Sequence, residues 1–386
     1  MPEACSSANS SLLTLTRHNA SFKAEIGFVP KDLDCDSEKM TAERSFRWLV
    51  TGGAGFLGVH IDRGLIERGQ EVTSYDIAGF PHDEKVEGVR IVQGDVRDKD
   101  HLARQLAGVD FVVHAAAALA LAAPEVINEV NAEGTRMVLE GCARAGVKRV
   151  VYIGSTAVYG MPRFHPIYEN SALEPMGDYG IAKAKAERYC VEATGVETVR
   201  IRPKSFIGTG RLGIFQILFD WIESGKKIPV LGNGENRFQL LEVRDLVEAL
   251  YLAALRGRDK EVYNIGAADF GTVNEDLGAL LKYANTGSKI FHIPSKPAKA
   301  ILAAFSALHL SPVYRWVYDT ADQDSFVSIE KAQKELGWRP RYSNQEAMIN
   351  TYAWYLREGK EMAKQTGTSH RVAWKQGVLR LVKAVM

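Results

Sequence analysis

The sequence shows no surplus of charge of either sign. Its 386 residues contain 48 Lys and Arg against 47 Asp and Glu, which gives a formal net charge of +1. A protein that binds nucleic acid through the phosphate backbone usually carries a clustered basic surplus. The balance therefore argues against a nucleic-acid partner.

Long apolar runs are also missing. The longest, at roughly residues 300–310, is well short of the ~20 residues that a membrane-spanning helix requires. We therefore predict a soluble chain without a transmembrane segment.

Cysteine is scarce and scattered. The four cysteines are Cys5, Cys35, Cys142 and Cys190, and no two of them stand close together in the sequence. This pattern argues against a disulfide framework and against a zinc site, and it fits a reducing compartment. We predict a cytoplasmic protein without a metal site.

The two ends of the chain differ from its middle. Residues 1–45 are polar and lack the apolar segment of a secretory signal, so we interpret them as a disordered extension. A true start at Met40 and a transit peptide remain alternatives. In the tail, 359–386, one helical stripe is apolar and basic residues surround it, which predicts an amphipathic helix. Docking of this helix onto the protein is favoured over contact with a membrane surface, and a frayed tail is a third possibility. The stripe consists of Trp374, Val378, Leu381, Val382 and Val385.

Between these ends, short apolar runs alternate with helical stretches. Near-continuous apolar strands separated by helices are typical of an α/β fold, with a doubly wound parallel sheet that helices cover on both faces. In such sheets the ligand binds at the carboxyl ends of the strands. The predicted strands are 48–51, 71–75, 89–92, 111–114, 149–153, 198–201 and 261–265.

The regular alternation of strands and helices ends after Pro203. We predict a dinucleotide-binding domain over 46–203, to which 241–270 returns, and a smaller C-terminal substrate-binding lobe made of 204–240 and 271–358. The lobe is expected to lie over the cofactor and close the substrate cleft.

A glycine-rich turn follows the first strand. Gly52, Gly55 and Gly58 allow a tight turn and a close approach of backbone N–H groups to a pyrophosphate at the start of a helix. Asp76 ends the next strand, where a carboxylate accepts the ribose hydroxyls and repels a 2′-phosphate. The turn therefore predicts a Rossmann-type site for NAD rather than NADP.

Two further strands end in residues suited to a cofactor. After the third strand, Asp95 and Val96 can hold the adenine edge. After the fourth strand, the small residues Ala115 and Ala116 let the chain pass against the cofactor. His114, just before them, is interpreted as a hydrogen-bonded structural histidine.

Three residues then supply proton-transfer chemistry. Tyr179 and Lys183 are four apart on a predicted helix, so both side chains leave the same face. A free phenol is a poor base at neutral pH, and a nearby ammonium stabilises its phenolate. Ser155, after the fifth strand, can bind the substrate oxygen as charge develops on it. The set predicts nicotinamide-dependent redox chemistry at an alcohol or carbonyl carbon, with a small-molecule substrate.

These motifs, in this order, resemble the extended short-chain dehydrogenases/reductases, the NAD-dependent epimerase/dehydratase superfamily. The resemblance covers about residues 46–358. It includes Val130-Asn131-Ala132-Glu133-Gly134-Thr135, Arg202-Pro203, Gly232-Asn233-Gly234, Val243-Arg244-Asp245-Leu246, Tyr263-Asn264-Ile265-Gly266 and Leu336-Gly337-Trp338-Arg339-Pro340.

The resemblance implies roles for particular residues. Ser155, Tyr179 and Lys183 would be catalytic, Asn131 would brace the active site, and Pro203 would lie by the nicotinamide. It also implies a homodimer through the helix of Tyr179 and the helix at 126–145. The expected cofactor contacts are Gly52, Gly55, Phe56, Leu57, Gly58, Asp76, Asp95, Val96, Ala115, Ala116, Asn131, Tyr179, Lys183 and Pro203.

The substrate is less well specified. Sugar 4,6-dehydratases of this family carry an acidic pair after the catalytic Ser or Thr, and here Thr156-Ala157 fills that place, so we reject dehydration. A nucleotide-sugar 4-epimerase is favoured slightly. However, Ser205 replaces a substrate-contacting asparagine, and Arg237 is one residue out of register with the phosphate-binding arginine. The expected substrate contacts are Ala117, Thr156, Ser205 and Arg237.

A second interpretation stays open. The segment 115–123 is almost entirely Ala and Leu, and Gly232-Asn233-Gly234-Glu235-Asn236 resembles the 3β-hydroxysteroid and sterol dehydrogenases. An apolar wall suits a dehydrogenase or reductase acting on an apolar secondary alcohol or ketone. A non-catalytic NAD-binding scaffold is the third hypothesis, which the intact Ser/Tyr/Lys set disfavours.

Overall fold

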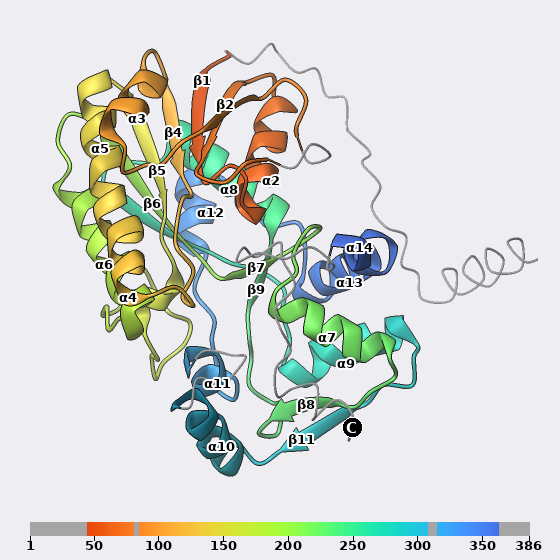
Figure 1. Cartoon of the computed structure of the whole chain (residues 1–386). Helices are drawn as coiled ribbons and strands as arrows, with labels where there is room; N and C mark the ends of the chain where they lie inside the picture. The colour runs from red at the N-terminus through yellow and green to blue at the C-terminus, as the bar shows by residue number, and fades with distance from the viewer. Residues whose placement is uncertain (1–44, 81–84, 308–314, 363–386) are drawn as a thin grey trace, which may run out of the picture. The chain divides into compact units, whose positions relative to one another are not determined.

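The computed structural model describes residues 45–80, 85–307 and 315–362 (Figure 1). The predictions of a disordered extension and of a C-terminal amphipathic helix concern residues that lie largely outside these ranges, so both stay predictions. No helix within the described ranges has the length and apolarity that crossing a membrane requires.

Seven parallel strands form the main sheet, in the order β10-β6-β5-β4-β1-β2-β3. All seven predicted strands are present, and the predicted fold class is confirmed. Each runs through the core as an apolar stretch: Val50, for example, is fully buried between Ser74 of β2 and Val113 of β4. The strands are β1 (Arg47–Thr51), β2 (Glu71–Asp76), β3 (Arg90–Gln93), β4 (Phe111–His114), β5 (Arg149–Ile153), β6 (Glu197–Pro203) and β10 (Glu261–Ile265).

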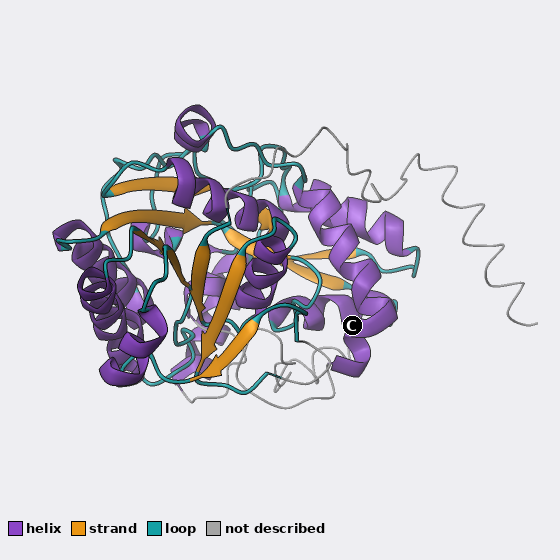
Figure 2. Cartoon of the chain, turned by 90° about the horizontal axis from the view of Figure 1, so that it is seen from above, coloured by secondary structure: helices purple, strands orange, loops and turns teal. Residues whose placement is uncertain are grey.

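Helices cover both faces of this sheet, as Figure 1 and Figure 2 show. One core cluster joins the sheet to α3 (Lys99–Leu106), α5 (Gly134–Ala145) and α6 (Gly177–Glu192). The other joins it to α2 (Phe56–Ile66), α8 (Val243–Arg256) and α12 (Glu330–Leu336). Because both faces are buried, the strands carry apolar residues without alternation.

Shorter turns connect these elements near the carboxyl ends of the strands. α4 (Pro124–Ile127) continues through a π-helical turn (Asn128–Glu133) directly into α5. A 3₁₀ turn (Thr156–Tyr159) follows β5.

The remaining elements lie outside this sheet, and several of them share a separate core. It contains Phe219, Trp221, Leu280 and Tyr352, and it joins α7, α9 and α13. Two small parallel sheets, β8 with β11 and β7 with β9, complete this region. The elements are β7 (Ser205–Ile207), α7 (Ile214–Glu223), β8 (Ile228–Leu231), β9 (Leu240–Glu242), α9 (Val273–Ala284), β11 (Ile290–Ile293), α10 (Ser295–Ala307), α11 (Arg315–Thr320), α13 (Asn344–Trp354), a π-helical turn (Tyr355–Gly359) and α14 (Lys360–Met362).

One extended segment, residues 324–328, links distant parts of the chain, and we refer to it as the 324–328 strap. Ile167 forms a bridge with Val327, and Phe238 forms a bridge with Ser325. The strap therefore lies between the loop that follows the 3₁₀ turn and the chain that leads into β9.

Candidate active site

In the glycine turn, the backbone of one segment lies directly against the backbone of another. Gly52 has φ of +75°, and a Cβ there would lie 2.7 Å from the N atom of Ala116. A Cβ at Gly58 would lie 2.2 Å from the carbonyl oxygen of Gly52. No side chain caps α2, whose first turn contains Phe56 and Leu57, so its N-terminal amides and dipole face the space beyond the turn. This cradle fits the pyrophosphate of a dinucleotide.

Asp76 stands beside this turn, at the end of β2. Its Oδ2 accepts from the Ala54 N–H at 3.0 Å and its Oδ1 accepts from the Ala78 N–H at 2.8 Å. Burial raises the pKa of this carboxyl, while the backbone N–H bonds oppose that rise. The carboxylate is thus held where the adenosine ribose is expected.

At the end of the third strand, Asp95 forms an ion pair. Asp95 is engaged by Arg97, whose Nη2 lies 2.7 Å from Oδ2 and whose Nε also donates to it. The Arg97 hydrogen bonds hold the pKa of Asp95 below its usual range. Val96 is buried in the core. Their expected contact with adenine stays a prediction.

The end of the fourth strand is tightly bonded. The Ala115 N–H donates to the Thr51 carbonyl at 3.1 Å, and the Ala116 N–H donates to the Thr51 hydroxyl at 3.3 Å. His114 is buried, and its ring nitrogens lie 2.7 Å from the Thr51 hydroxyl and 3.0 Å from the Thr135 hydroxyl. Burial, aided by the charge of Lys183, lowers the pKa of His114 to about 3. The ring is therefore neutral and structural, as predicted.

Asn131 lies in the π-helical turn before α5 and is buried. Its Oδ1 accepts from the Ala118 N–H at 2.6 Å and its Nδ2 donates to the Ala118 carbonyl at 3.0 Å. The oxygen and the nitrogen of the Asn131 side-chain amide thus both hold the alanine-rich segment, which we expect next to the substrate. Ala117, the preceding residue, is exposed.

Ser155, Tyr179 and Lys183 converge at the carboxyl end of β5. Ser155 caps the 3₁₀ turn, and its Oγ accepts from the Ala157 N–H at 3.1 Å. The Lys183 Nζ donates to the Ile153 carbonyl at 2.8 Å, two residues before Ser155. The same Nζ lies 5.9 Å from the ring centroid of Tyr179. The fold therefore brings the three predicted catalytic residues together.

Lys183 is buried in a charged environment that the sequence motif does not show. Burial lowers its pKa to about 8, and Glu187, one helical turn further on, opposes this effect. Glu187 is also buried and accepts from the Arg202 Nε at 2.9 Å. Arg202 in turn donates to the Tyr159 hydroxyl at 2.7 Å. Sequence reasoning missed this network, although the four-residue spacing from Lys183 to Glu187 was a signal for it.

The predicted substrate contacts lie on separate segments. Thr156 Oγ1 donates to the Pro203 carbonyl at 3.4 Å, so the position next to Ser155 is tied to the end of β6. Ser205 begins β7 and pairs with Leu240 of β9.

Arg237 is held by aromatic rings. Its Cζ lies 4.5 Å from the ring centroid of Phe270 and 5.0 Å from that of Phe326, and its Nη2 donates to the Phe270 carbonyl at 3.2 Å. Phe238 follows it, and the Nζ of Lys204 lies 5.1 Å from the Phe238 ring centroid. Sequence reasoning missed Lys204.

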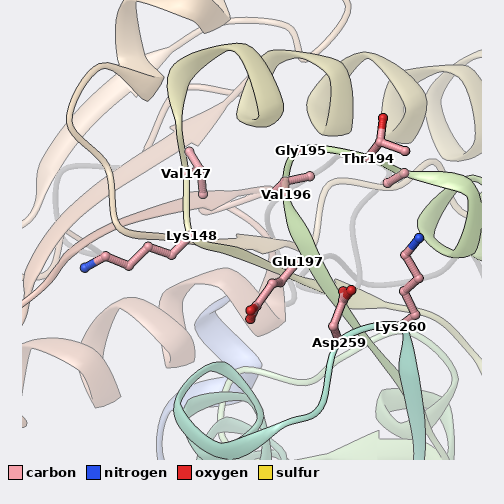
Figure 3. A pocket seen from close by; sticks show the side chains of 9 residues that line it. Val147, Lys148, Thr194, Gly195, Val196, Glu197, Asp259 and Lys260 are labelled. Atoms are coloured by element: carbon pink, nitrogen blue, oxygen red, sulfur yellow. The ribbon is translucent and has the colours of Figure 1, made fainter.

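A shallow hollow of about 540 Å³ lies elsewhere (Figure 3). Its lining includes Lys148, Glu197 and Lys260, which stand at or just before the amino ends of β5, β6 and β10. Ser155 and Asp76 lie at the carboxyl ends of their strands, so the hollow is at the opposite edge of the sheet. It is not the candidate active site. No cluster of three metal-binding side chains occurs in the part of the chain that the structure describes.

Comparison with known families agrees with this geometry. Residues 48–266 match the model of the NAD dependent epimerase/dehydratase family. The chain belongs to this family. It is therefore an NAD-dependent enzyme, and the residues around the glycine turn suit that cofactor.

Relatives in the family have different activities. The uncharacterized protein y4nG of Sinorhizobium fredii is 38% identical over 86% of this chain and 85% of its own length. A dTDP-glucose 4,6-dehydratase of Streptomyces niveus is 28% identical over 80% of this chain and 92% of its own. A 3β-hydroxysteroid dehydrogenase/Δ5→4-isomerase of Mycobacterium tuberculosis is 27% identical over 83% and 93%.

Among solved structures, the fold is similar to that of a UDP-glucose 4-epimerase from Thermotoga maritima. The TM-score is 0.68 at 24% identity, and the match covers 81% of this chain and 99% of the other. This likeness supports the family fold and leaves the substrate of this chain open.

Proposed function

We propose that the chain transfers hydride reversibly at a secondary alcohol, with Tyr179 as the proton-transfer residue. The observation that carries the proposal is the convergence of Tyr179, Lys183 and Ser155 at the end of β5. NAD, when bound, accepts or returns the hydride. Gly52 and Gly58 would hold its pyrophosphate, Asp76 would hold its adenosine ribose, and Lys183 and Pro203 would lie at the nicotinamide half.

Each member of the set has a separate role. The Lys183 ammonium faces the Tyr179 ring and favours the phenolate, which removes the proton from the substrate hydroxyl. Because the Ile153 carbonyl fixes Lys183, the ammonium keeps this position. The Ser155 hydroxyl would donate to the substrate oxygen as negative charge develops on it. In the reverse direction, Tyr179 returns the proton to the oxygen.

For the substrate, we infer a nucleotide sugar and a 4-epimerase reaction. Elimination of water requires an acid beside the catalytic serine, and here Thr156 and Ala157 fill that place, with the Thr156 hydroxyl bonded to Pro203. Epimerisation needs only the removal and return of one hydride and one proton: the hydride would go to NAD and come back, and Tyr179 would take up and return the proton. The expected sugar-nucleotide contacts are Ala117, Thr156, Ser205 and Arg237.

Calorimetric titration of the NAD-loaded protein with UDP, GDP and dTDP tests this proposal. Saturable binding of one nucleotide, followed by interconversion of its 4-epimeric sugars without accumulation of NADH, is the expected result. Binding of none of the three would refute the nucleotide-sugar assignment.

A second candidate is a dehydrogenase acting on an apolar secondary alcohol. Arg237, one residue out of register with the phosphate-binding arginine of the epimerases, is packed against Phe270 and Phe326. The alanine-rich segment held by Asn131 adds an apolar wall. This enzyme would release NADH when given NAD with a steroid or lipid alcohol, which absorbance at 340 nm would detect.

We also propose that the chain forms a homodimer through α4, α5 and α6. Val126 of α4 and Ile181 and Val191 of α6 leave 42%, 54% and 41% of their surfaces exposed. Exposed apolar side chains on adjacent helices are suited to an isologous interface. Sedimentation of the wild type and of Ile181→Glu would test it, with dissociation expected in the variant.

A further inference from the structure

Lys204 is buried, and among the residues that the structure describes it has no acidic partner. Only 2% of its surface is exposed. Its Nζ donates to the Ser325 hydroxyl at 2.6 Å and faces the ring of Phe238. Within the described ranges, no carboxylate forms an ion pair with it. By contrast, the buried Arg202 is paired with Glu187, and the partly buried Lys331 is paired with Glu261.

An unpaired ammonium is expensive to bury, since it loses its hydration and gains no opposite charge in return. Burial accordingly lowers the pKa of Lys204 to about 7. Ser325 satisfies one of the three N–H donors of the ammonium form. Such a group, placed in an enzyme, is a candidate for direct contact with a ligand.

The location supports a contact with substrate. Lys204 stands between Pro203, which is expected at the nicotinamide, and Ser205, which is expected at the substrate. Its Nζ contacts two segments. One is the chain that leads into β9, at Phe238, and the other is the 324–328 strap, at Ser325.

A third segment approaches from the catalytic loop between Ser155 and Tyr179. Its His165 packs on Phe326 of the strap, with ring centroids 5.0 Å apart. Burial lowers the pKa of His165, Asp324 opposes the decrease, and Lys204 adds to it. Within the described part of the chain, the charged and titratable groups around Lys204 are therefore His165, Asp324 and, beside Phe238, Arg237.

We propose that Lys204 and Ser325 bind an anionic oxygen of the substrate, from a phosphate or a carboxylate. The site rests on the proposed function in one respect, namely that substrate binds beyond Pro203. An anionic oxygen supplies the ion-pair partner that Lys204 lacks among the described residues, and the Ser325 hydroxyl already lies beside its Nζ.

The two sources of the anion predict different ligands. A nucleotide sugar would present its diphosphate, for which UDP, GDP and dTDP are the probes. An apolar hydroxy acid, in keeping with the dehydrogenase candidate, would present a carboxylate, for which 3-hydroxydodecanoate is the probe.

Calorimetry of the NAD-loaded full chain with each probe tests the site. We expect one class of anion to bind the wild type and to take up a proton at pH 8, seen as a heat that depends on the ionisation enthalpy of the buffer. Lys204→Met should weaken that anion about 10- to 100-fold, the range for loss of a hydrogen bond to a charged group, and should abolish the proton uptake. Affinity for NAD should not change.

Three further variants complete the design. Lys204→Arg should retain part of the anion affinity, and Ser325→Ala should lower it by less than Lys204→Met does. Lys331→Met removes a lysine that also lies over a ring, at 5.3 Å from Tyr263, but is paired with Glu261, and it should bind the anion as the wild type does. If Lys204→Met does not fold, the anion affinities of Lys204→Arg and Ser325→Ala test the site in its place.

The outcomes separate this proposal from the nucleotide-sugar assignment. Binding of the hydroxy acid but of no nucleotide, with dependence on Lys204, supports the anion site and refutes the nucleotide sugar. Binding of a nucleotide with equal affinity in wild type and Lys204→Met refutes the anion site alone. A wild type that binds none of the probes overturns the anion site as well.

Discussion

Replacing Lys204 by methionine should change how the stability of the protein depends on pH. In the folded protein the ammonium has a pKa of about 7 because it is buried, whereas an unfolded lysine has the ordinary value of 10.5. Between these values the unfolded chain binds more protons than the folded one, so the wild type gains stability as pH rises. Lys204→Met lacks this contribution.

The size of the effect follows from the two pKa values. Where the unfolded chain binds one proton more than the folded protein, each pH unit changes the free energy of unfolding by about 1.4 kcal/mol. From pH 7 to pH 9 the folded lysine passes from half protonated to neutral, so the average difference is slightly below one proton. The wild type should therefore gain about 2 kcal/mol relative to Lys204→Met over this interval.

Urea unfolding of the two proteins at pH 7 and pH 9 measures this change. All other titrating groups are shared, so they cancel in the difference between the proteins. Lys331→Met serves as the control for removal of a lysine as such. A difference between wild type and Lys204→Met that is the same at both pH values would show that Lys204 keeps its charge in the folded protein, and the reasoning would fail.

Three other substitutions test the site. Tyr179→Phe should lower the rate of hydride transfer by about 10²- to 10⁴-fold while NAD affinity stays unchanged; turnover at the wild-type rate would remove Tyr179 from proton transfer. Asp76→Ala should weaken NAD binding and narrow the preference over NADP, measured by fluorescence titration with both reduced cofactors; an unaltered ratio would exclude Asp76 from the ribose site. Asn131→Ala leaves the Ala118 N–H and carbonyl without their side-chain partner, so it should cost about 1–3 kcal/mol in urea unfolding. A loss below about 0.5 kcal/mol, the size that is usual for substitutions at the surface, would mean that solvent replaces the amide.

Much of the fold was predictable because its signals are local. Apolar runs such as 111–114 and 149–153 coincide with β4 and β5. The glycine turn was predicted because only residues without a Cβ fit so close to Gly52 and Ala116. The Tyr179–Lys183 spacing placed both residues on one helical face, and the order of the strands brought Ser155 to the same edge of the sheet. The sequence therefore determined the family and the cofactor, and it predicted the proton-transfer set.

The tertiary structure decided the environment of these residues. Asp95 forms an ion pair with Arg97, and the buried Glu187 forms one with Arg202. Helical or strand periodicity predicts neither of these ion pairs. Lys204 reads in the sequence as an ordinary lysine after a proline. Its burial and its bond to Ser325 depend on a contact between residues 121 positions apart. Secondary structure and turns follow from neighbouring residues, whereas the burial and pairing of a charge depend on which distant segments the folded chain places around it.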